Sequence, residues 1–363
     1  MESSVTIDKP SFSLPQSVRP DGPAQPATDY NALQSVAVGR AEAALLGSAQ
    51  SVAACPHSAI AGSAIRAAVD RTAAYRSASL ADSSKRAYRA DLAHFIGWGG
   101  AIPSTPELIA RYCADHGETL SSFTLNRRLV AIGKAHRAQC FENPCATEQV
   151  RAVLRGIRRV HGAAQRQVDP LLREELLAII DSLPATTKGM RDRALLLVGF
   201  AAALRRSELV ALTVADVRFG SEGLTIRLRR SKTDQEAEGR DIGVPFGRTR
   251  ACPVKALRAW LDHAGITTGP ILRSVAKGGR IQPEAMTAQS VALVVKSRAA
   301  RIGLDPKRFS GHSLRAGLLT SAAKLGVSAH KLRQQSGHRS DAMVARYVRD
   351  GELFVGNAAG AVL

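Results

Sequence analysis

Residues 194–204 read ALLLVGFAAAL and are followed by RRSE at 205–208. This is the longest apolar stretch near the middle of the chain, and it spans 11 residues, whereas a bilayer span needs about 20. We therefore expect it to lie inside a folded domain, within a helical segment from Met190 to Val214. Glu208 comes three residues after Arg205 and is expected on the same helix face.

Downstream of this segment, a strand pattern appears among helical ones. Leu224, Ile226 and Leu228 alternate with polar residues, which predicts a strand. A polar turn at 231–239 leads to a second short strand at 242–245, so we expect an antiparallel hairpin. The other segments of this region have helical periodicity. They cover residues 171–183, 253–264, 287–302, 313–325, 329–335 and 341–349.

Upstream of Pro170, amphipathic segments predict a second, all-helical domain. Ser83 and Ser84 are expected to cap its first helix and Thr124 its third. Its second and fourth helices are expected at 106–116 and 150–160. The expected organisation of the whole chain is a flexible, Ala-rich N-terminal extension (1–80), the helical domain (81–162), a linker (163–170), the second domain (171–350) and a C-terminal tail (351–363).

The charge of the chain is large and unevenly placed. There are 50 Lys and Arg against 31 Asp and Glu, a net charge of +19, and residues 1–80 contribute none of it. Arg accounts for 39 of the 50 basic residues, and its guanidinium suits bidentate contacts to phosphate. The excess favours a polyanionic partner, most simply nucleic acid. Solubility, or a compositional bias toward Arg and Ala codons, remains an alternative explanation of the charge taken alone.

Cysteine and histidine usage does not favour a metal site. The five cysteines are scattered and form no CxxC pair, so neither a zinc ribbon nor a disulfide framework is indicated. Cys113 with His116, and His136 with Cys140, have a spacing that could place two ligands on one helix face. Ordinary half-buried helix residues explain both pairs better, and we expect no metal.

Several polar residues stand where hydrophobic packing would not select them. Lys232 lies at the tip of the predicted hairpin, and His312 and Arg315 are three residues apart on one predicted helix. His338 precedes Tyr347 by nine residues. Each of these patterns occurs widely by chance, whereas the whole set in one order is a specific signal.

In this order the motifs resemble those of the tyrosine recombinases, the group of phage integrases and Xer-type resolvases. The matching segments are ALRRSEL (203–209), SKT (231–233), GHSLRAG (311–317) and SGH (336–338), followed by Tyr347. The resemblance extends over residues 81–355, with clear motifs only in the second domain. Ala203 and Ser336 depart from the family, which usually has Gly and Leu at these positions.

The resemblance implies a mainly α-helical fold with a small antiparallel β-sheet in the catalytic domain. A helical core DNA-binding domain and the catalytic domain would form a C-shaped clamp around double-stranded DNA carrying specific recombination sites. The tail would dock on a neighbouring subunit within a homo-tetramer on two duplexes. No signal peptide is recognisable at the N-terminus. We therefore expect a cytoplasmic, nucleoid-associated protein of a bacterium or phage, with no membrane partner.

The chemistry that these residues suit is DNA transesterification. This reaction needs a nucleophile, a leaving-group acid and fixed positive charge at the non-bridging phosphate oxygens. The second domain has no recognisable carboxylate cluster for two metal ions, and guanidinium groups can take their place. By resemblance, Arg205 and Arg315 clamp the phosphate and His338 adds a third donor. Glu208 is expected to orient Arg205 or His312.

The nucleophile and the acid follow from the same resemblance. Tyr347 would attack phosphorus and form a 3′-phosphotyrosine, while His312 would handle the phenol proton. Lys232 would protonate the departing 5′ oxygen, and neighbouring Arg charges would lower its pKa from the usual value of about 10.4. The covalent link conserves the phosphodiester, so no cofactor, neither ATP nor metal, is implied.

The basic helices and the hairpin are expected to contact DNA. The candidate residues are Arg127, Arg128, Lys134, Arg137, Arg155, Arg158, Arg159, Arg227, Arg229 and Arg230. The sequence thus predicts a site-specific DNA recombinase, with the neutral extension favouring integration of a mobile element over other tasks. The alternatives are a type IB topoisomerase-like enzyme that relaxes DNA, and a non-catalytic protein of the same fold that binds or bridges DNA.

Overall fold

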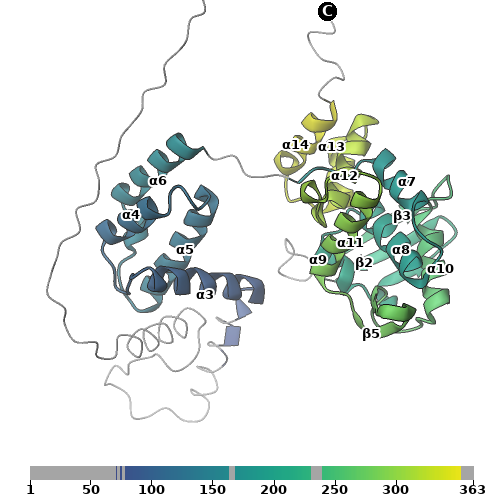
Figure 1. Cartoon of the computed structure of the whole chain (residues 1–363), viewed down its shortest axis with the longest axis horizontal. Coiled ribbons are helices and arrows are strands. Elements are labelled where there is room, and N and C mark those ends of the chain that lie inside the picture. The colour runs from purple at the N-terminus through teal and green to yellow at the C-terminus, as the bar shows by residue number, and fades with distance from the viewer. Residues whose placement is uncertain (1–70, 72–73, 76–77, 163–167, 230–238, 353–363) are drawn as a thin grey trace, which may run out of the picture. The chain divides into compact units, whose positions relative to one another are not determined.

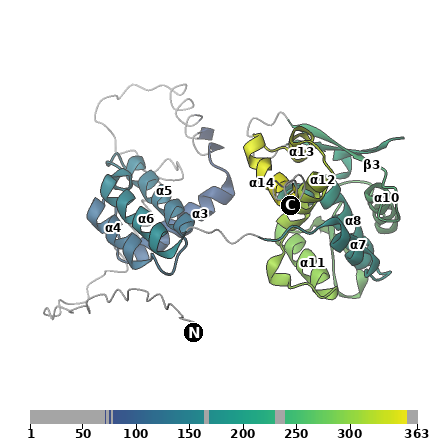
Figure 2. The ribbon, with the colours of Figure 1, turned by 90° about the horizontal axis from the view of Figure 1, so that it is seen from above.

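The computed structural model describes residues 71, 74–75, 78–162, 168–229 and 239–352. The chain divides into two compact units, an N-terminal unit (Met1–Gln165) and a C-terminal unit (Arg166–Leu363), and each is described by itself (Figures 1 and 2). Lys232, Arg230, most of the N-terminal extension and the tail from residue 353 onward lie outside the described residues. Among the described helices, none is both long and apolar enough to cross a membrane.

The N-terminal unit is a helical domain. Its elements are α3 (Asp82–Gly97), α4 (Pro106–Asp115), α5 (Ser122–Ala138), the 3₁₀ turn η2 (Pro144–Ala146) and α6 (Glu148–His161). The four helices are those that periodicity predicts. Their core contains Phe95, Tyr112, Leu125 and Ile132, each without exposed surface.

Two of the predicted helix caps in this unit are wrong. The helix α3 already begins at Asp82, behind Ala81, which offers no side-chain cap. At α5 the cap is Ser121 rather than Thr124, because the Ser121 hydroxyl accepts a hydrogen bond from the Thr124 backbone N–H (3.2 Å). Adjacent hydroxyl residues all have capping propensity, and only the backbone geometry selects one of them.

In the two cysteine and histidine pairs of this unit, His136 and Cys113 are buried residues of the helical core. His136 is buried, with Nδ1 2.8 Å from the Ile132 carbonyl oxygen, and its Nε2 accepts a hydrogen bond from Ser104 N (2.9 Å). Cys113 is also buried, and desolvation raises the pKa of its thiol to about 12. Within the described ranges, no group of three or more His, Cys, Asp or Glu side chains could hold a metal ion.

The C-terminal unit is mainly helical, with two small antiparallel sheets. Its helices are α7 (Arg173–Asp181), α8 (Thr187–Ala201), α9 (Arg206–Ala211), α10 (Pro253–Ala264), α11 (Ala288–Arg301), α12 (His312–Lys324), α13 (Ala329–Ser336) and α14 (Asp341–Glu352). In the core, α8 packs against α10 and α12, and the last three helices contact one another at one end of the unit (Figures 1 and 2).

The predicted hairpin is present and has one additional strand. The strands β1 (Val217–Phe219), β2 (Gly223–Leu228) and β3 (Arg240–Pro245) form an antiparallel sheet in that order. Leu224, Ile226 and Leu228 point to the buried face, as the alternation predicts. The strands β4 (Arg273–Val275) and β5 (Ile281–Ala285) form a second sheet, which was not predicted. Every residue in both strands is at least partly exposed, and strands without a buried face leave no alternation of apolar and polar residues in the sequence.

The predicted helical segment from Met190 to Val214 is broken into α8 and α9. Ala203 has φ +50°, in the left-handed region, which ends the helix before Arg205. Only glycine adopts this conformation without a steric penalty, so an alanine here is uncommon. The turn places Arg205 at the start of α9 instead of in the middle of a helix.

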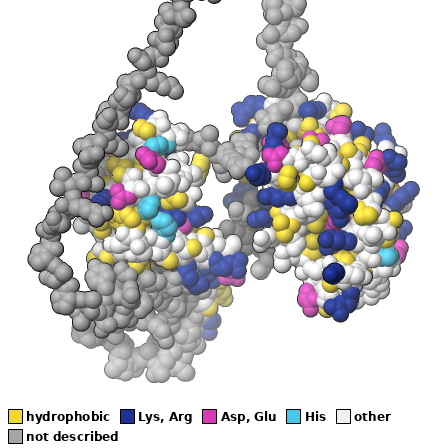
Figure 3. Space-filling model, in the orientation of Figure 1, with side chains coloured by type: hydrophobic (Ala, Val, Ile, Leu, Met, Phe, Trp, Pro, Cys, Tyr) yellow, Lys and Arg dark blue, Asp and Glu magenta, His cyan; other side chains and the backbone are white. Residues whose placement is uncertain are grey.

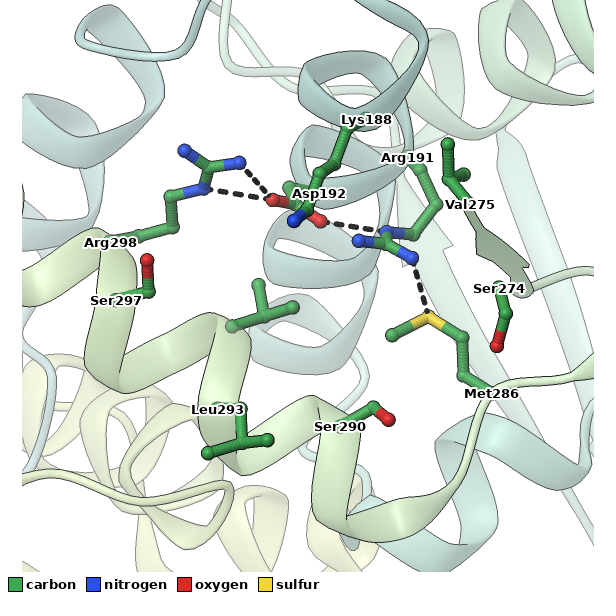
Figure 4. Close-up of a pocket in the computed structure, with 11 residues that line it drawn as sticks. Lys188, Arg191, Asp192, Ser274, Val275, Met286, Ser290, Leu293, Ser297 and Arg298 are labelled. Carbon is green, nitrogen blue, oxygen red and sulfur yellow. Dashed lines mark hydrogen bonds and ion pairs between the residues drawn. The ribbon is translucent and has the colours of Figure 1, made fainter. Parts of the chain in front are cut away.

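A buried ion cluster joins α8 to the rest of the core (Figure 4). Asp192, with almost no exposed surface, accepts hydrogen bonds from Arg191 Nε (2.7 Å) and from Arg298 Nε on α11 (2.8 Å). Arg191 Nη1 also donates to the Arg273 carbonyl oxygen of β4 (3.3 Å). The cluster borders a cavity of about 290 Å³, which Lys188 also lines. One carboxylate therefore compensates two buried guanidinium groups, and the cluster as a whole connects α8, α11 and β4.

We expect Asp192→Asn to lower the free energy of unfolding by about 3 kcal/mol or more, because two buried cations lose their counter-charge. Urea denaturation of the full chain measures this loss. The matched control is Asp181→Asn, which removes an exposed partner of Arg250 (2.6 Å) and is expected to cost less than about 1 kcal/mol. Equal losses for the two variants would contradict a structural role for the buried cluster.

Candidate active site

Five of the six predicted catalytic residues line one cleft of about 630 Å³ in the C-terminal unit. These residues are Arg205, His312, Arg315, His338 and Tyr347, and they come from α9, α12, α14 and the turn after α13. The sixth, Lys232, lies outside the described residues. The fold thus brings together side chains that are up to 142 positions apart in the sequence.

Arg205 is held at the beginning of α9 by Glu208. The Glu208 carboxylate accepts a hydrogen bond from the Arg205 backbone N–H (2.9 Å) and another from its guanidinium Nη1 (2.5 Å). Glu208 is almost fully buried, whereas the Arg205 side chain keeps 19% of its surface exposed toward the cleft. The motif RRSE therefore builds a helix cap and orients a guanidinium at the same time. Glu208 contacts Arg205, which is one of the two partners expected from the sequence.

Arg315 lies at the floor of the cleft with 1% of its surface exposed. Its Nη1 donates to the Ala203 carbonyl oxygen (2.7 Å), in the left-handed turn before Arg205. Desolvation, followed by the charge of Arg205, lowers the pKa of Arg315 to about 10. The guanidinium remains protonated at neutral pH and presents a fixed positive charge to the cleft.

Gly317, at the end of the GHSLRAG segment, has a packing role. A Cβ atom at Gly317 would lie 1.8 Å from the Leu171 carbonyl oxygen. Only glycine therefore lets the residues before α7 approach α12 this closely. Leu171 N donates in turn to the Ser313 carbonyl oxygen (2.9 Å). This contact fixes the N-terminal part of α12, which carries His312 and Arg315.

His312 and Tyr347 face each other across the cleft. The Nε2 atom of His312 lies 2.9 Å from the Tyr347 hydroxyl. Desolvation by the surrounding protein lowers the pKa of His312, and the charges of Arg315, Arg346 and Arg205 lower it further. The neutral imidazole that results at neutral pH can accept the phenolic proton of Tyr347.

His338 follows the C-terminal cap of α13. Gly337 has φ +67°, which ends the helix and directs His338 toward Arg315. Burial lowers the pKa of His338 to about 4, together with the charges of Arg315 and Arg205. The ring is therefore neutral at neutral pH. Its Nε2 lies 3.1 Å from Arg315 Nη2 and its Nδ1 lies 2.7 Å from the Ser336 hydroxyl.

Arg240 supports this region and was missed by the sequence analysis. It begins β3, and its Nη1 donates to the carbonyl oxygens of Gln334 (3.1 Å) and Gln335 (3.0 Å), at the C-terminus of α13. A Cβ atom at Gly337 would lie 2.7 Å from Arg240 Nε, so the guanidinium packs directly against that turn. A single Arg at the start of a strand gives no sequence signal for such a contact.

Three further arginines line the cleft around Tyr347. Arg339, Arg346 and Arg349 come from α14 and the residues before it. None of them was predicted, although Arg346 and Arg349 recur at helical spacing beside the nucleophile candidate, which is a signal that could have found them. The cleft thus gathers five Arg side chains in total, which suits a bound phosphate diester.

The predicted DNA-contacting residues of α5 have unequal surroundings. Arg127 forms a bidentate pair with buried Asp91 (2.8 Å for both bonds) and is half exposed. Arg128 has 11% of its side chain exposed and is hydrogen-bonded to Tyr112 (3.0 Å), so its expected role as a DNA contact does not fit. Its guanidinium is part of the interior polar network of the unit.

The remaining predicted contacts that the structure describes lie at the surface, except for half-buried Lys134. These exposed residues are Arg137, Arg155, Arg158, Arg159, Arg227 and Arg229. Three of them have acidic neighbours: Arg155 pairs with Glu148, Arg227 with Asp241 and Arg229 with Asp216. On the face of the C-terminal unit that Figure 3 shows, Lys and Arg side chains are spread among the other residues.

Comparison with known proteins identifies relatives over most of the chain. The Phage integrase family model matches residues 170–352. The integrase/recombinase xerD homolog of Selenomonas ruminantium is 38% identical over 290 residues, which cover 77% of this chain and 85% of that protein. The tyrosine recombinase XerC of Xanthomonas campestris pv. campestris is 28% identical over 268 residues, which cover 72% of this chain and 76% of the relative.

Solved structures share the fold. The XerH site-specific recombinase bound to a palindromic difH substrate matches with a TM-score of 0.59 and 16% identity, over 81% of this chain and 84% of that one. The Tn1549 transposon integrase in complex with transposon right end DNA matches with a TM-score of 0.57 and 15% identity, over 81% and 95%. The family match, the relatives and the motif residues in one cleft agree, and the chain belongs to the phage integrase family of tyrosine recombinases.

Proposed function

We propose that this protein is a site-specific DNA recombinase that cleaves and rejoins strands through a covalent 3′-phosphotyrosine at Tyr347. The observation that carries this proposal is the pair of Tyr347 and His312, 2.9 Å apart, in a cleft that also contains Arg205 and Arg315. It combines a nucleophile, a proton acceptor and a phosphate clamp in one place.

In the proposed reaction, the scissile phosphate occupies the cleft between Arg205 and Arg315. Their guanidinium groups donate to the non-bridging oxygens, where negative charge increases in the transition state. Glu208 holds Arg205 in place and so reduces the reorganisation needed on binding. Neutral His312 accepts the proton of Tyr347 as the phenolic oxygen attacks phosphorus.

The bond between phosphorus and the 5′ oxygen breaks as the tyrosyl bond forms. Lys232 is the proposed acid that protonates the departing oxygen, and it carries a proton at neutral pH unless its pKa is strongly lowered. A 5′ hydroxyl of a second strand reverses the steps and restores Tyr347. One phosphodiester is exchanged for another, so the cycle consumes no ATP, and the cations replace metal ions at the phosphate.

The N-terminal helical domain is proposed to hold the duplex opposite the catalytic domain, in a C-shaped clamp. The exposed residues Arg137, Arg158 and Arg159 are available for phosphate contacts, as is Arg127, which Asp91 already orients. Synapsis would join four subunits on two duplexes, with the tail 351–363 docking on a neighbour. Sedimentation of the protein with its DNA site, with and without this tail, measures that assembly.

Integration of a mobile element in the cytoplasm of a bacterium, by a protein that the bacterium or a phage encodes, is the proposed biological task. The named transposon integrase shares the fold, and the neutral N-terminal extension has the character of an accessory segment outside the DNA clamp. A topoisomerase or a DNA-bridging protein would use the same phosphate clamp. These two functions are outcomes of the experiments that follow.

We expect wild-type protein to form a covalent adduct with a nicked duplex carrying its own site, because loss of the nicked fragment blocks religation. Tyr347→Phe is expected to form none, since the nucleophile is removed. Denaturing electrophoresis detects the adduct, and Tyr88→Phe, on α3 of the helical domain, is the control that keeps it. Absence of adduct from wild type on cognate sites would favour the non-catalytic alternative, and relaxation of a supercoiled plasmid without recombination would favour the topoisomerase.

Lys232→Ala is expected to slow adduct formation by about 10²- to 10⁴-fold, the usual contribution of a general acid. Replacing the leaving 5′ oxygen by sulfur should restore the rate, since a thiolate leaves without protonation. Single-turnover rates on both substrates measure this effect. Lys255→Ala, an exposed lysine on α10, is the control. An equal defect on both substrates would assign the acid role to another residue.

The rate of adduct formation is expected to be constant around neutral pH and to fall only below about pH 6.5, the ordinary pKa of a histidine. The sign follows from the lowered pKa of His312, because its neutral, proton-accepting form is fully present above that pKa. Single-turnover rates measured over a range of pH values show where the rate decreases, and circular dichroism checks that the protein stays folded. A decrease in rate with its midpoint at or above about pH 6.5, the ordinary histidine pKa, would contradict the role of His312 as proton acceptor. A decrease that persists in His312→Gln would contradict it as well.

A further inference from the structure

Arg240 and Gln335 join the end of α13 to β3 and to the end of α8. Arg240 is the first residue of β3, and its Nη1 donates to the carbonyl oxygens of Gln334 (3.1 Å) and Gln335 (3.0 Å). The side chain of Gln335 donates in turn from Nε2 to the carbonyl oxygens of Ala201 (2.9 Å) and Gly243 (3.2 Å). Ala201 is the last residue of α8, and Gly243 lies on β3. The end of α13 is therefore bonded to a strand and to a second helix.

The two helix ends that meet here lead directly to active-site residues. His338 lies three residues beyond Gln335. The end of α8 leads within two residues to the left-handed turn at Ala203, whose carbonyl oxygen accepts from Arg315 (2.7 Å) and which precedes Arg205. The contacts of Arg240 and Gln335 therefore fix the His338 turn relative to the turn that holds both arginines of the phosphate clamp.

Arg240 packs closely against the His338 turn. A Cβ atom at Gly337 would lie 2.7 Å from Arg240 Nε and 2.8 Å from its Cζ. The cation also lies at the C-terminus of α13, where the helix dipole favours positive charge. In the part of the chain that the structure describes, the buried Nη2 atom has no hydrogen-bond partner. A buried donor without an acceptor costs free energy, so stability alone explains this residue poorly.

The charge of Arg240 acts on the active site, although Arg240 is not one of the described residues that line the cleft. Burial is the main cause of the lowered pKa of His338, and the charges of four neighbouring groups lower it further: Arg315, Arg205, His312 and Arg240. Arg240 therefore lies behind the cleft, near enough to affect the His338 ring through its charge as well as through the turn.

We propose that Arg240, together with Gln335, is a positioning residue that holds the His338 turn against Arg315. His338 can then donate to the same scissile phosphate as Arg205 and Arg315 without a rearrangement on DNA binding. This effect on the reaction rests on the proposed function, whereas the placement of His338 in the free protein is tested without any reaction. A residue that only stabilised the fold would change neither the surroundings of His338 nor the contribution of His338 to the rate.

The first experiment titrates the histidine rings of the full-length protein by nuclear magnetic resonance, with His338→Gln for assignment. We expect the pKa of His338 to be higher in Arg240→Met than in wild type, because a nearby cation is lost and the turn becomes more open to solvent. The matched control is Arg273→Met, which removes a guanidinium that donates to the carbonyl oxygens of Thr268 (2.6 Å) and Pro270 (3.1 Å). It should leave the pKa of His338 unchanged. An unchanged pKa in Arg240→Met would overturn the proposal.

The second experiment measures the single-turnover rate of adduct formation on the nicked duplex. Arg240→Met is expected to lower this rate about tenfold to 100-fold with DNA affinity unchanged, because a misplaced donor reduces transition-state stabilisation. Gln335→Leu should act in the same direction, and it tests the proposal independently if circular dichroism shows that Arg240→Met is not folded. Arg273→Met should keep the wild-type rate.

A double variant tests whether Arg240 acts through His338. In a protein that already carries His338→Gln, Arg240→Met should lower the rate less than about twofold further, since the ring that it positions is absent. Losses that multiply in the double variant would overturn the proposal, because Arg240 would then act independently of His338.

The experiments separate this proposal from the proposed function. Wild-type rates in both Arg240→Met and Gln335→Leu would reject the positioning role while the adduct itself upheld the recombinase. No adduct from wild type would reject the recombinase, and the titration would still decide whether Arg240 holds the His338 turn in the free protein.

Discussion

The buried guanidinium of Arg315 is the constraint around which the C-terminal unit is organised. A charge with 1% exposure is costly unless fixed partners compensate it. Ala203 provides a carbonyl oxygen, which requires α8 to end in a left-handed turn at that residue. The same turn puts Arg205 at the beginning of α9, where Glu208 holds it. A phosphate in the cleft would bring further negative charge to both guanidinium groups, in addition to that of Glu208.

Burial, reinforced by the clustered cations, decides the protonation of both histidines. Burial and the Arg charges lower the pKa of His312 and bring that of His338 to about 4, so both rings are neutral. The neutral ring of His312 can accept the Tyr347 proton, which is the role that the proposed function gives it. His338 was expected as a phosphate donor, and its ring lies against Arg315, with Nε2 3.1 Å from Nη2. The electrostatic environment, more than residue identity, assigns these roles.

Some of the basic residues that give the net charge of +19 have their guanidinium groups in internal ion pairs. Asp192 compensates two guanidinium groups in the C-terminal unit, and Asp91 in the N-terminal unit pairs with Arg127 and Arg128. The total charge therefore overstates the surface available for DNA. Arg128 illustrates this, because its place on a basic helix suggests an outward side chain while its contacts are internal.

The sequence by itself determined the helices, the hairpin and the catalytic candidates, because these depend on local periodicity and on short motifs. The tertiary structure decided what depends on packing between distant segments: the break at Ala203, the inward position of Arg128, and the convergence of Arg205, Arg315 and Tyr347. Ser336 and Arg240 belong to the same class, since their partners lie across a turn or on another element. Periodicity reports which face of an element is buried, whereas only the folded chain shows which group it meets there.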